Sequence, residues 1–290
     1  MIIVYSYHGI LPLYTIYTIY QSRLFSNDKI YLITDDLQSP IINIIKKYDV
    51  LVISYNEVRS EQFDELINSI GNYPIVKELI SVNRENLFLF SLERFFLLYN
   101  LMKIYDISNI LFLELDNMIY DDPENWKFNY DLSYLYIHKF KSSTGIMYVK
   151  SFVMLEKLLN KISEIIKKDK VSEMYCTYVF AEENKNIVEY LPNHYDDHNF
   201  KNYNSIFDGL AIGVYMFGYD PIHTGGKIVT NAHLVGADRQ YLNEIFEWKY
   251  DDKERKIPYI YNKNNKTFVR INNLHIHSKT LEKALSTTYL

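Results

Sequence analysis

One stretch, residues 110–120 with the sequence ILFLELDNMIY, constrains this chain more than any other. A continuous apolar run bounded by polar residues is typical of a strand buried on both faces of a sheet. The run ends in two carboxylates, Glu114 and Asp116, which project from the same face because side chains alternate across a strand. In open α/β sheets ligands bind outside the carboxyl ends of the strands, so we expect this acidic pair at a ligand site.

The chemistry of the acidic pair points to a cation. Two carboxylates this close repel each other unless they share a cation or a proton. Hard oxygen ligands suit Mg²⁺ or Mn²⁺, which is usually bound through one or two carboxylates and the phosphates of a substrate. The pair is therefore a candidate metal–diphosphate site. Short acidic motifs are common, so a strand end whose carboxylates only cap the next turn is an equally open interpretation.

Strands and helices alternate along the chain. The pattern predicts strands at 2–6, 29–34, 50–53, 132–137, 146–149 and 268–279, and helices at 11–25, 38–48, 85–105 and 152–168. Alternation of this kind predicts a parallel, doubly wound sheet with helices on its faces. No repeat, linker or low-complexity segment divides the chain, so we expect one domain spanning residues 1–290.

Composition excludes several classes of protein. Hydrophobic residues make up 48% and charged residues 23% of the chain, as in globular proteins. The net charge of −5 argues against a nucleic-acid partner. We find no signal peptide and no apolar run long enough to span a membrane, which predicts a cytoplasmic protein. The single cysteine, Cys176, excludes an internal disulfide, and its apolar context favours a buried structural thiol.

Arg94 interrupts the apolar stripe of the helix predicted at 85–105. An arginine on a buried side needs an anionic partner. That partner is either the acidic pair or ligand phosphates, or else Arg94 forms an internal salt bridge with Glu93 or Asp106 or extends to solvent.

Two later segments carry further polar candidates. His275 and His277 share a face of the last predicted strand, with Lys279 just beyond, and this order suits a metal ligand and a phosphate contact. A structural histidine pair on an edge strand is the alternative. Residues 207–221 hold three glycines between Asp208 and Asp220, which predicts a tightly packed element with close backbone contacts, and they lack the known phosphate-loop patterns.

Residues 192–198 contain two histidines and two aspartates. Because no period fixes their geometry, a surface loop is favoured over a second metal site.

Together these segments resemble nucleotide-sugar glycosyltransferases of the GT-A type, in the group with an E-x-D version of the D-x-D metal motif. The matching residues are SLERFF at 91–96, LELDNMIY at 113–120, FDG at 207–209, GYDP at 218–221 and NLHIHSK at 273–279. The resemblance extends over most of the chain. It implies a Rossmann-like α/β fold with a mixed, mostly parallel sheet flanked by helices.

The resemblance also implies roles at the metal and the diphosphate. Asp116 would bind Mn²⁺ (or Mg²⁺) directly, and Glu114 would assist through the metal or the ribose. A C-terminal histidine would complete the protein ligands, and we favour His277 over His275 because it is nearer the predicted strand end. Lys279, together with Arg94, would neutralise the diphosphate.

Further implied roles concern the nucleoside, the sugar and the acceptor. Tyr5, Ser6 and Asp35 correspond to the nucleoside pocket. The 144–145 region and the segment from Asp208 to Asp220 would face the sugar and a glycan or small-molecule acceptor, and these two aspartates are the candidate catalytic bases.

The expected function is thus metal-dependent transfer of a hexosyl or N-acetylhexosaminyl group from a nucleotide sugar, UDP-linked, to an acceptor hydroxyl. Two alternatives use the same acidic strand. One is a metal-dependent nucleotidyltransferase or phosphohydrolase, and the other is a catalytically inactive nucleotide-sugar-binding homologue.

Overall fold

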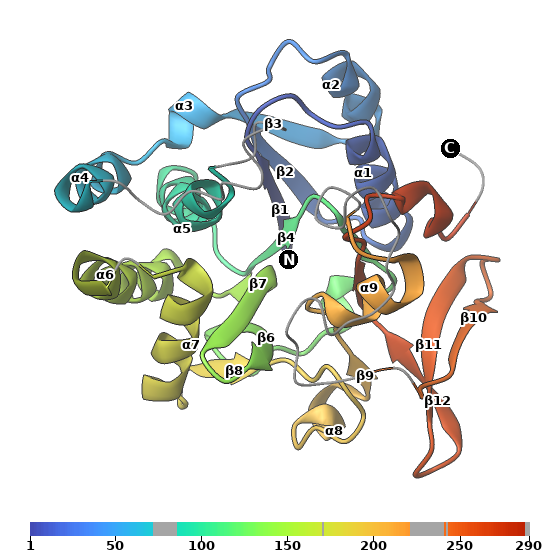
Figure 1. Ribbon diagram of the computed structural model, residues 1–290. Coiled ribbons are helices and arrows are strands. Elements are labelled where there is room, and N and C mark those ends of the chain that lie inside the picture. Colours follow the sequence, from blue (N-terminus) through green and yellow to red (C-terminus); the bar gives the residue numbers. More distant parts are fainter. Residues whose placement is uncertain (72–85, 170, 221–240, 242, 288–290) are drawn as a thin grey trace.

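A computed structural model describes residues 1–71, 86–169, 171–220, 241 and 243–287 of the chain. Its main sheet has the strand order β3-β2-β1-β4-β7-β6-β8 (Figure 1). These strands are β1 (Ile2–Tyr7), β2 (Lys29–Thr34), β3 (Val50–Ser54), β4 (Ile110–Glu114), β6 (Leu132–His138), β7 (Lys141–Val149) and β8 (Val188–Tyr190). β1, β2, β3 and β4 run parallel, β7 is antiparallel to both β4 and β6, and β8 is parallel to β6. The expected mixed, mostly parallel sheet flanked by helices is confirmed.

Helices cover both faces of this sheet. They are α1 (Tyr14–Phe25), α2 (Pro40–Ile45), α3 (Tyr55–Val58), α4 (Glu61–Ile70), α5 (Leu87–Ile104), α6 (Phe152–Asp169) and α7 (Glu173–Glu183), with short 3-10 helices η1 (Lys46–Tyr48) and η3 (Pro123–Asn125). Two hydrophobic clusters result, one under α1 and α2 and one under α4, α5, α6 and α7. Side chains alternate between the two faces of a strand, so β1 contributes to both clusters. Ile3 and Tyr5 lie in the first cluster and Val4 lies in the second.

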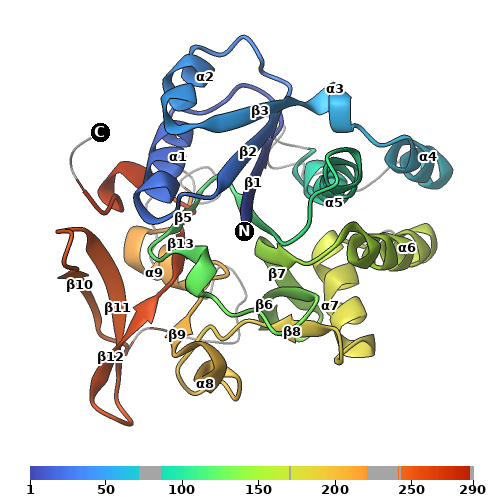
Figure 2. The ribbon, with the colours of Figure 1, turned by 180° about the vertical axis from the view of Figure 1, so that it is seen from behind.

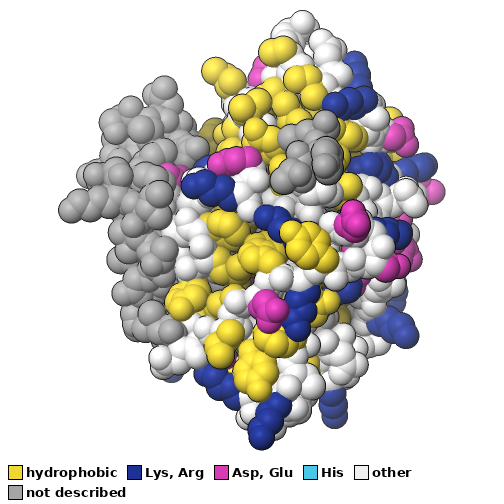
Figure 3. All heavy atoms as spheres, turned by 90° about the vertical axis from the view of Figure 1, so that its right-hand side faces the viewer, with side chains coloured by type: hydrophobic (Ala, Val, Ile, Leu, Met, Phe, Trp, Pro, Cys, Tyr) yellow, Lys and Arg dark blue, Asp and Glu magenta, His cyan; other side chains and the backbone are white. Residues whose placement is uncertain are grey.

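The remaining elements lie outside the main sheet and the helices that cover it. They are β5 (Asn117–Ile119), α8 (Phe200–Tyr203), β9 (Ser205–Ile206), α9 (Ala211–Phe217), β10 (Phe246–Tyr250), β11 (Lys256–Asn262), β12 (Thr267–Ile271), β13 (Asn273–His275) and η6 (Leu281–Lys283). Two of them, β5 and η6, contact α1. A smaller sheet has the order β10-β11-β12-β9. Figure 3 shows the side of the molecule on which its strands lie, with hydrophobic side chains interspersed among charged ones. Within this sheet, Lys249 of β10 contacts an aromatic ring of β12, with its Nζ 3.5 Å from the centre of the Phe268 ring.

The pairing of β5 with β13 brings the segment that follows Glu114 and Asp116 next to the segment that contains His275. The strands are antiparallel, with His275 opposite Asn117, and Figure 2 shows them side by side. The backbone N–H of Ile276 also donates to the carbonyl of Asp116, at 2.8 Å. The histidine segment therefore lies against the residues that directly follow the acidic strand.

Several predicted boundaries need correction. The strand expected at 268–279 is two strands, β12 and β13, interrupted at Asn272, and His277 follows the second one. Residues 142–145, expected to precede a strand, lie within β7. The loop at 192–198 is exposed at Asp196 and His198, but His194 is only 3% exposed, so the surface interpretation is wrong for that residue.

Two predicted features reach outside the described residues. The helix expected from residue 85 begins at Leu87, and residue 85 itself is not described. Pro221, at the end of the glycine-containing segment, is likewise outside the described part. Among the described helices, none combines the length and the apolar character that crossing a membrane requires.

Candidate functional site

A cavity of about 700 Å³ opens at the carboxyl ends of β1 and β4. Most of the residues predicted for the site line it, namely Ser6, Arg94, Glu114, Asp116, Asp220, His275, His277 and Lys279. Ser6 lies opposite Glu114 in the pairing of β1 with β4, which places both at the same edge. This is where the position of the acidic strand led us to expect a ligand.

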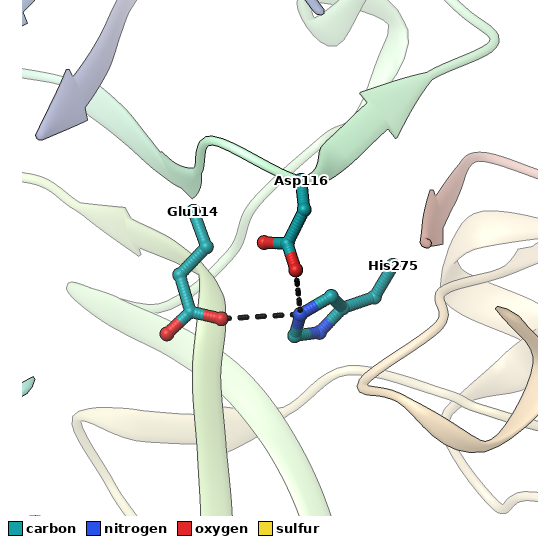
Figure 4. A group of neighbouring side chains, drawn as sticks. All are labelled: Glu114, Asp116 and His275. Atoms are coloured by element: carbon teal, nitrogen blue, oxygen red, sulfur yellow. Dashed lines mark ion pairs between the residues drawn. The ribbon is translucent and has the colours of Figure 1, made fainter. Parts of the chain in front are cut away.

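Three of these side chains form a compact cluster. His275 Nε2 lies 3.3 Å from Glu114 Oε2 and 3.3 Å from Asp116 Oδ2. Figure 4 shows the two carboxylates and the imidazole pointing toward one another. One donor atom from each residue lies within 4.8 Å of the others, as in the protein part of a metal site.

The second nitrogen of His275 is held by the main chain. Its Nδ1 lies 3.3 Å from the carbonyl oxygen of Gly209, an acceptor that requires the proton to be on Nδ1. Metal-binding histidines almost always donate their other ring N–H to a carbonyl or carboxylate, which fixes the tautomer and orients the ring. This arrangement leaves Nε2 to face the carboxylates.

Gly145 makes room for the cluster. A Cβ at this position would lie 2.9 Å from Glu114 Oε2 and 3.2 Å from His275 Nδ1. Only a residue without a side chain lets β7 pass this close to both groups.

The cluster is strongly charged. Burial alone would raise the pKa of Asp116, but the positive charges of Lys279 and His275 hold that pKa well below its usual range. Burial alone would lower the pKa of His275, but the neighbouring Asp116 and Glu114 outweigh it and raise this pKa to about 9. His275 and Lys279 thus lie against the two carboxylates at the place where a cation would bind.

Lys279 reaches the cluster from a left-handed backbone conformation with φ of 62°. Its backbone N–H donates to the carbonyl of Ile276 at 2.9 Å, which closes a tight turn after β13. The ammonium group then contacts Asp116 Oδ2.

Arg94 supplies a second cation, from α5. One guanidinium nitrogen contacts Glu114 Oε1, and another donates to Thr144 Oγ1 at 2.7 Å and lies 3.7 Å from Glu173 Oε1. The sequence left open a salt bridge with Glu93, but Glu93 instead accepts a hydrogen bond from the Tyr55 hydroxyl.

Glu173, at the start of α7, is a cavity residue that the sequence analysis missed. It is 4% exposed, and its Oε2 has no hydrogen-bond partner among the described residues. Burial raises the pKa of its carboxyl, while the charge of Arg94 acts in the opposite direction. An acidic residue in the first turn of a helix is so common that the sequence carries no signal of this role.

Three predicted site residues do not line the cavity. Tyr5 is fully buried in the cluster beneath α1, where its hydroxyl lies 2.5 Å from Ser22 Oγ. Asp35 is exposed and contacts two residues of the cavity lining, with Oδ2 2.5 Å from His8 Nδ1 and Oδ1 accepting from Gly9 N–H. Asp208 is 1% exposed and accepts four backbone N–H groups, so it has the geometry of a structural cap rather than of an accessible base.

The two histidines have different positions. His277 lies on the cavity wall with its ring centre 6.1 Å from that of His275 and stacks on Tyr219. Its Nδ1 accepts the backbone N–H of Asp220 at 3.2 Å. Of the two, only His275 belongs to the cluster with the carboxylates.

Comparison with known proteins gives structural likenesses only. No protein-family model matches the sequence, and no curated protein matches it. The fold is similar to that of mouse xyloside xylosyltransferase 1 in its apo form, covering 69% of this chain and 90% of that one at 9% identity and a TM-score of 0.47. The structure of the galactosyltransferase LgtC in complex with donor and acceptor sugar analogues is also similar. The match covers 67% of this chain and 74% of LgtC, at 11% identity and a TM-score of 0.43.

The PaToxG glycosyltransferase is a third such structure. It covers 63% of this chain and 69% of its own at 12% identity and a TM-score of 0.40. All three TM-scores are below 0.5.

Proposed function

We propose that this chain is a metal-dependent glycosyltransferase that moves a sugar from a nucleotide-sugar donor, UDP-linked, to an acceptor hydroxyl. The observation that carries this proposal is the convergence of Glu114, Asp116 and His275 on one wall of a 700 Å³ cavity that also holds Arg94 and Lys279. Metal ligands beside two cations suit an anionic ligand, such as a diphosphate, better than a neutral one.

The donor set fits a divalent cation. Two carboxylates and one imidazole nitrogen suit Mn²⁺ or Mg²⁺, and the nitrogen favours Mn²⁺ because Mg²⁺ prefers oxygen ligands. The anchored Nδ1–H of His275 presents Nε2 in the tautomer that a metal needs. In place of His277, which the sequence favoured, we propose His275 as the histidine ligand.

The chemistry follows from charge. Departure of a nucleoside diphosphate from the anomeric carbon builds negative charge on the leaving oxygens, and a bound divalent cation would stabilise this charge as a Lewis acid. Lys279 and Arg94 lie where they would add to that stabilisation. Glu173 Oε2, buried at the cavity without a partner among the described residues, would accept a hydrogen bond from a sugar hydroxyl.

The acceptor hydroxyl must lose a proton if the reaction inverts the anomeric centre. Of the two aspartates predicted for this role, Asp220 lines the cavity and Asp208 does not. Asp220 therefore stays as the proposed base for an inverting enzyme, while a retaining enzyme needs none.

A thermal-shift assay tests the donor and the metal together. We expect UDP to raise the melting temperature with Mn²⁺ and not with EDTA, because ligand binding to the folded state stabilises it. Asp116→Asn should abolish this response. The matched control is Asp131→Asn, a change in an exposed ion pair with Lys150, which should leave the response intact. Failure of every nucleoside diphosphate to shift the wild-type protein with metal would overturn the proposal.

The reaction products separate the competing activities. With a panel of nucleotide sugars, a glycosyltransferase releases a nucleoside diphosphate through slow hydrolysis in the absence of acceptor, and EDTA should stop the release. A nucleotidyltransferase would release pyrophosphate from a mixed pool of substrates instead.

A further inference from the structure

Asp208 lies at the junction between β9 and α9, and both of its carboxylate oxygens are fully used. Oδ1 accepts the backbone N–H groups of Leu210 at 2.8 Å and Ile212 at 3.0 Å. Oδ2 accepts those of Gly213 at 2.7 Å and His275 at 3.0 Å. One oxygen thus organises the start of α9, while the other joins α9 to the main chain of His275.

Gly213 brings the two backbones into direct contact. A Cβ at this position would lie 1.9 Å from the carbonyl oxygen of His275, far inside any possible contact. The segment 208–213 therefore holds His275 at three points. Asp208 binds its N–H, Gly213 packs on its carbonyl, and the Gly209 carbonyl lies 3.3 Å from its ring Nδ1.

Two buried amides extend this junction to the acidic strand. The side chain of Asn273 donates to the carbonyl of Asp208 and to Asn117 Oδ1, both at 2.8 Å, and its own oxygen accepts the N–H of Asp208 at 3.1 Å. Asn117 in turn donates to the carbonyl of Gly145 at 3.1 Å. Asn117 directly follows Asp116, so α9, β13, β5 and β7 are tied together around the cluster.

We propose that Asp208 is a positioning residue that fixes the imidazole of His275 against Glu114 and Asp116. This inference rests on the proposed function, because it assigns the junction the task of preorganising a metal ligand. Residues that orient a metal ligand from behind typically change metal affinity by 10–100-fold when substituted. In this scheme Asp208 contacts neither the metal, the donor nor the reacting atoms, and it acts on the metal through His275.

The variant Asp208→Asn tests the assignment with the smallest change in shape. An amide keeps one acceptor oxygen, and its NH₂ group opposes the two backbone N–H groups that the other oxygen served. We expect the dissociation constant for Mn²⁺, measured with UDP present by the loss of the free-ion EPR signal, to rise about tenfold. In turnover assays the metal concentration for half-maximal rate should rise more than the rate at saturating metal falls.

A double-mutant cycle with His275→Ala separates positioning from general damage. If Asp208 acts through His275, Asp208→Asn weakens Mn²⁺ binding in the presence of His275 and has no further effect when combined with His275→Ala. Equal losses in both backgrounds, or unchanged affinity of Asp208→Asn, would overturn the inference while leaving the proposed function in place. Absence of Mn²⁺ binding by the wild-type protein with UDP would overturn both.

Stability needs its own control. Ser60→Ala removes the N-cap of α4, a helix away from the cavity, and should lower the melting temperature without changing Mn²⁺ affinity. If Asp208→Asn does not fold, Gly213→Ala enters the same cycle, because it keeps the charge of Asp208 while its Cβ displaces the carbonyl of His275 and presses on Asp208 Oδ2, 2.9 Å away. Wild-type affinity in a folded Gly213→Ala protein would then count against the inference.

Discussion

At the scale of single residues, Arg94 is the buried cation on which two carboxylates depend. We expect Arg94→Gln to lower the free energy of unfolding by about 3–5 kcal/mol, because removing one partner of a buried ion pair leaves the other uncompensated. The loss should affect Glu173 more than Glu114, because Glu173 is only 4% solvent-exposed and Arg94 is the cation beside it. Urea denaturation measures the change.

The double variant Arg94→Gln with Glu173→Gln is the control for that prediction. It removes both charges of the pair and should recover part of the loss, on the order of 1–2 kcal/mol. If Arg94→Gln alone were as stable as the wild-type protein, the pair would contribute nothing, and the structure would be wrong about the burial of its charges.

The sequence identified most of the charged residues around the cavity but not their exact arrangement. Glu114, Asp116 and Lys279 were found because apolar runs with polar ends are visible in a sequence. The resemblance implied a place in the cavity for Tyr5. Its neighbour Ser6 is the residue that pairs with Glu114, and because side chains alternate along a strand, Tyr5 points to the opposite face of β1. The preference for His277 assumed an unbroken strand, whereas the interruption at Asn272 sets the register that places His275 against β5.

At the scale of secondary-structure elements, Gln21 links α1 to two other segments. Its amide nitrogen donates to the carbonyl of Ile119 at 2.9 Å and to Ser286 Oγ at 2.7 Å, and its oxygen accepts the N–H of Ser286 at 3.0 Å. Gln21→Ala leaves buried backbone groups without partners and should cost about 2–4 kcal/mol of unfolding free energy. Chemical denaturation monitored by circular dichroism measures the loss.

Gln62 on α4 provides a matched control, since it is exposed and carries the same amide. Gln62→Ala should change the stability by less than about 0.5 kcal/mol. Equal effects of the two substitutions would show that the C-terminal segment is not held through Gln21.

Sequence periodicity predicts the longer helices α1, α5 and α6, but it predicts no helix at α4, and the small strands could not be predicted. Apolar residues at spacings of three and four mark α5 over many turns, so its predicted and observed bounds nearly coincide. β13 spans only Asn273–His275 and depends on pairing with β5, more than 150 residues away. Pairing of such short segments is set by tertiary contacts, which periodicity does not report.

At the scale of the whole molecule, the single cysteine reports the integrity of the core. Cys176, on α7, is fully buried in the second hydrophobic cluster, and burial raises the pKa of its thiol to about 12. Only the thiolate reacts with disulfide reagents, and at pH 8 a thiol with this pKa is ionised to the order of 10⁻⁴. We therefore expect a reagent such as DTNB to modify Cys176 only when the molecule opens.

Labelling then couples the site to the stability of the fold. The native protein should react slowly at pH 8. In denaturant, the reaction should release one equivalent of thionitrobenzoate from DTNB per chain, and this measurement is the control for reagent and protein concentration. UDP with Mn²⁺ should slow the native reaction further, because a ligand that binds the folded state alone lowers the population of open molecules. Full labelling within the dead time of a manual assay in native buffer would show that α7 does not pack as described. An unchanged rate with ligand would mean that Cys176 is exposed by local opening of α7, independent of the cavity.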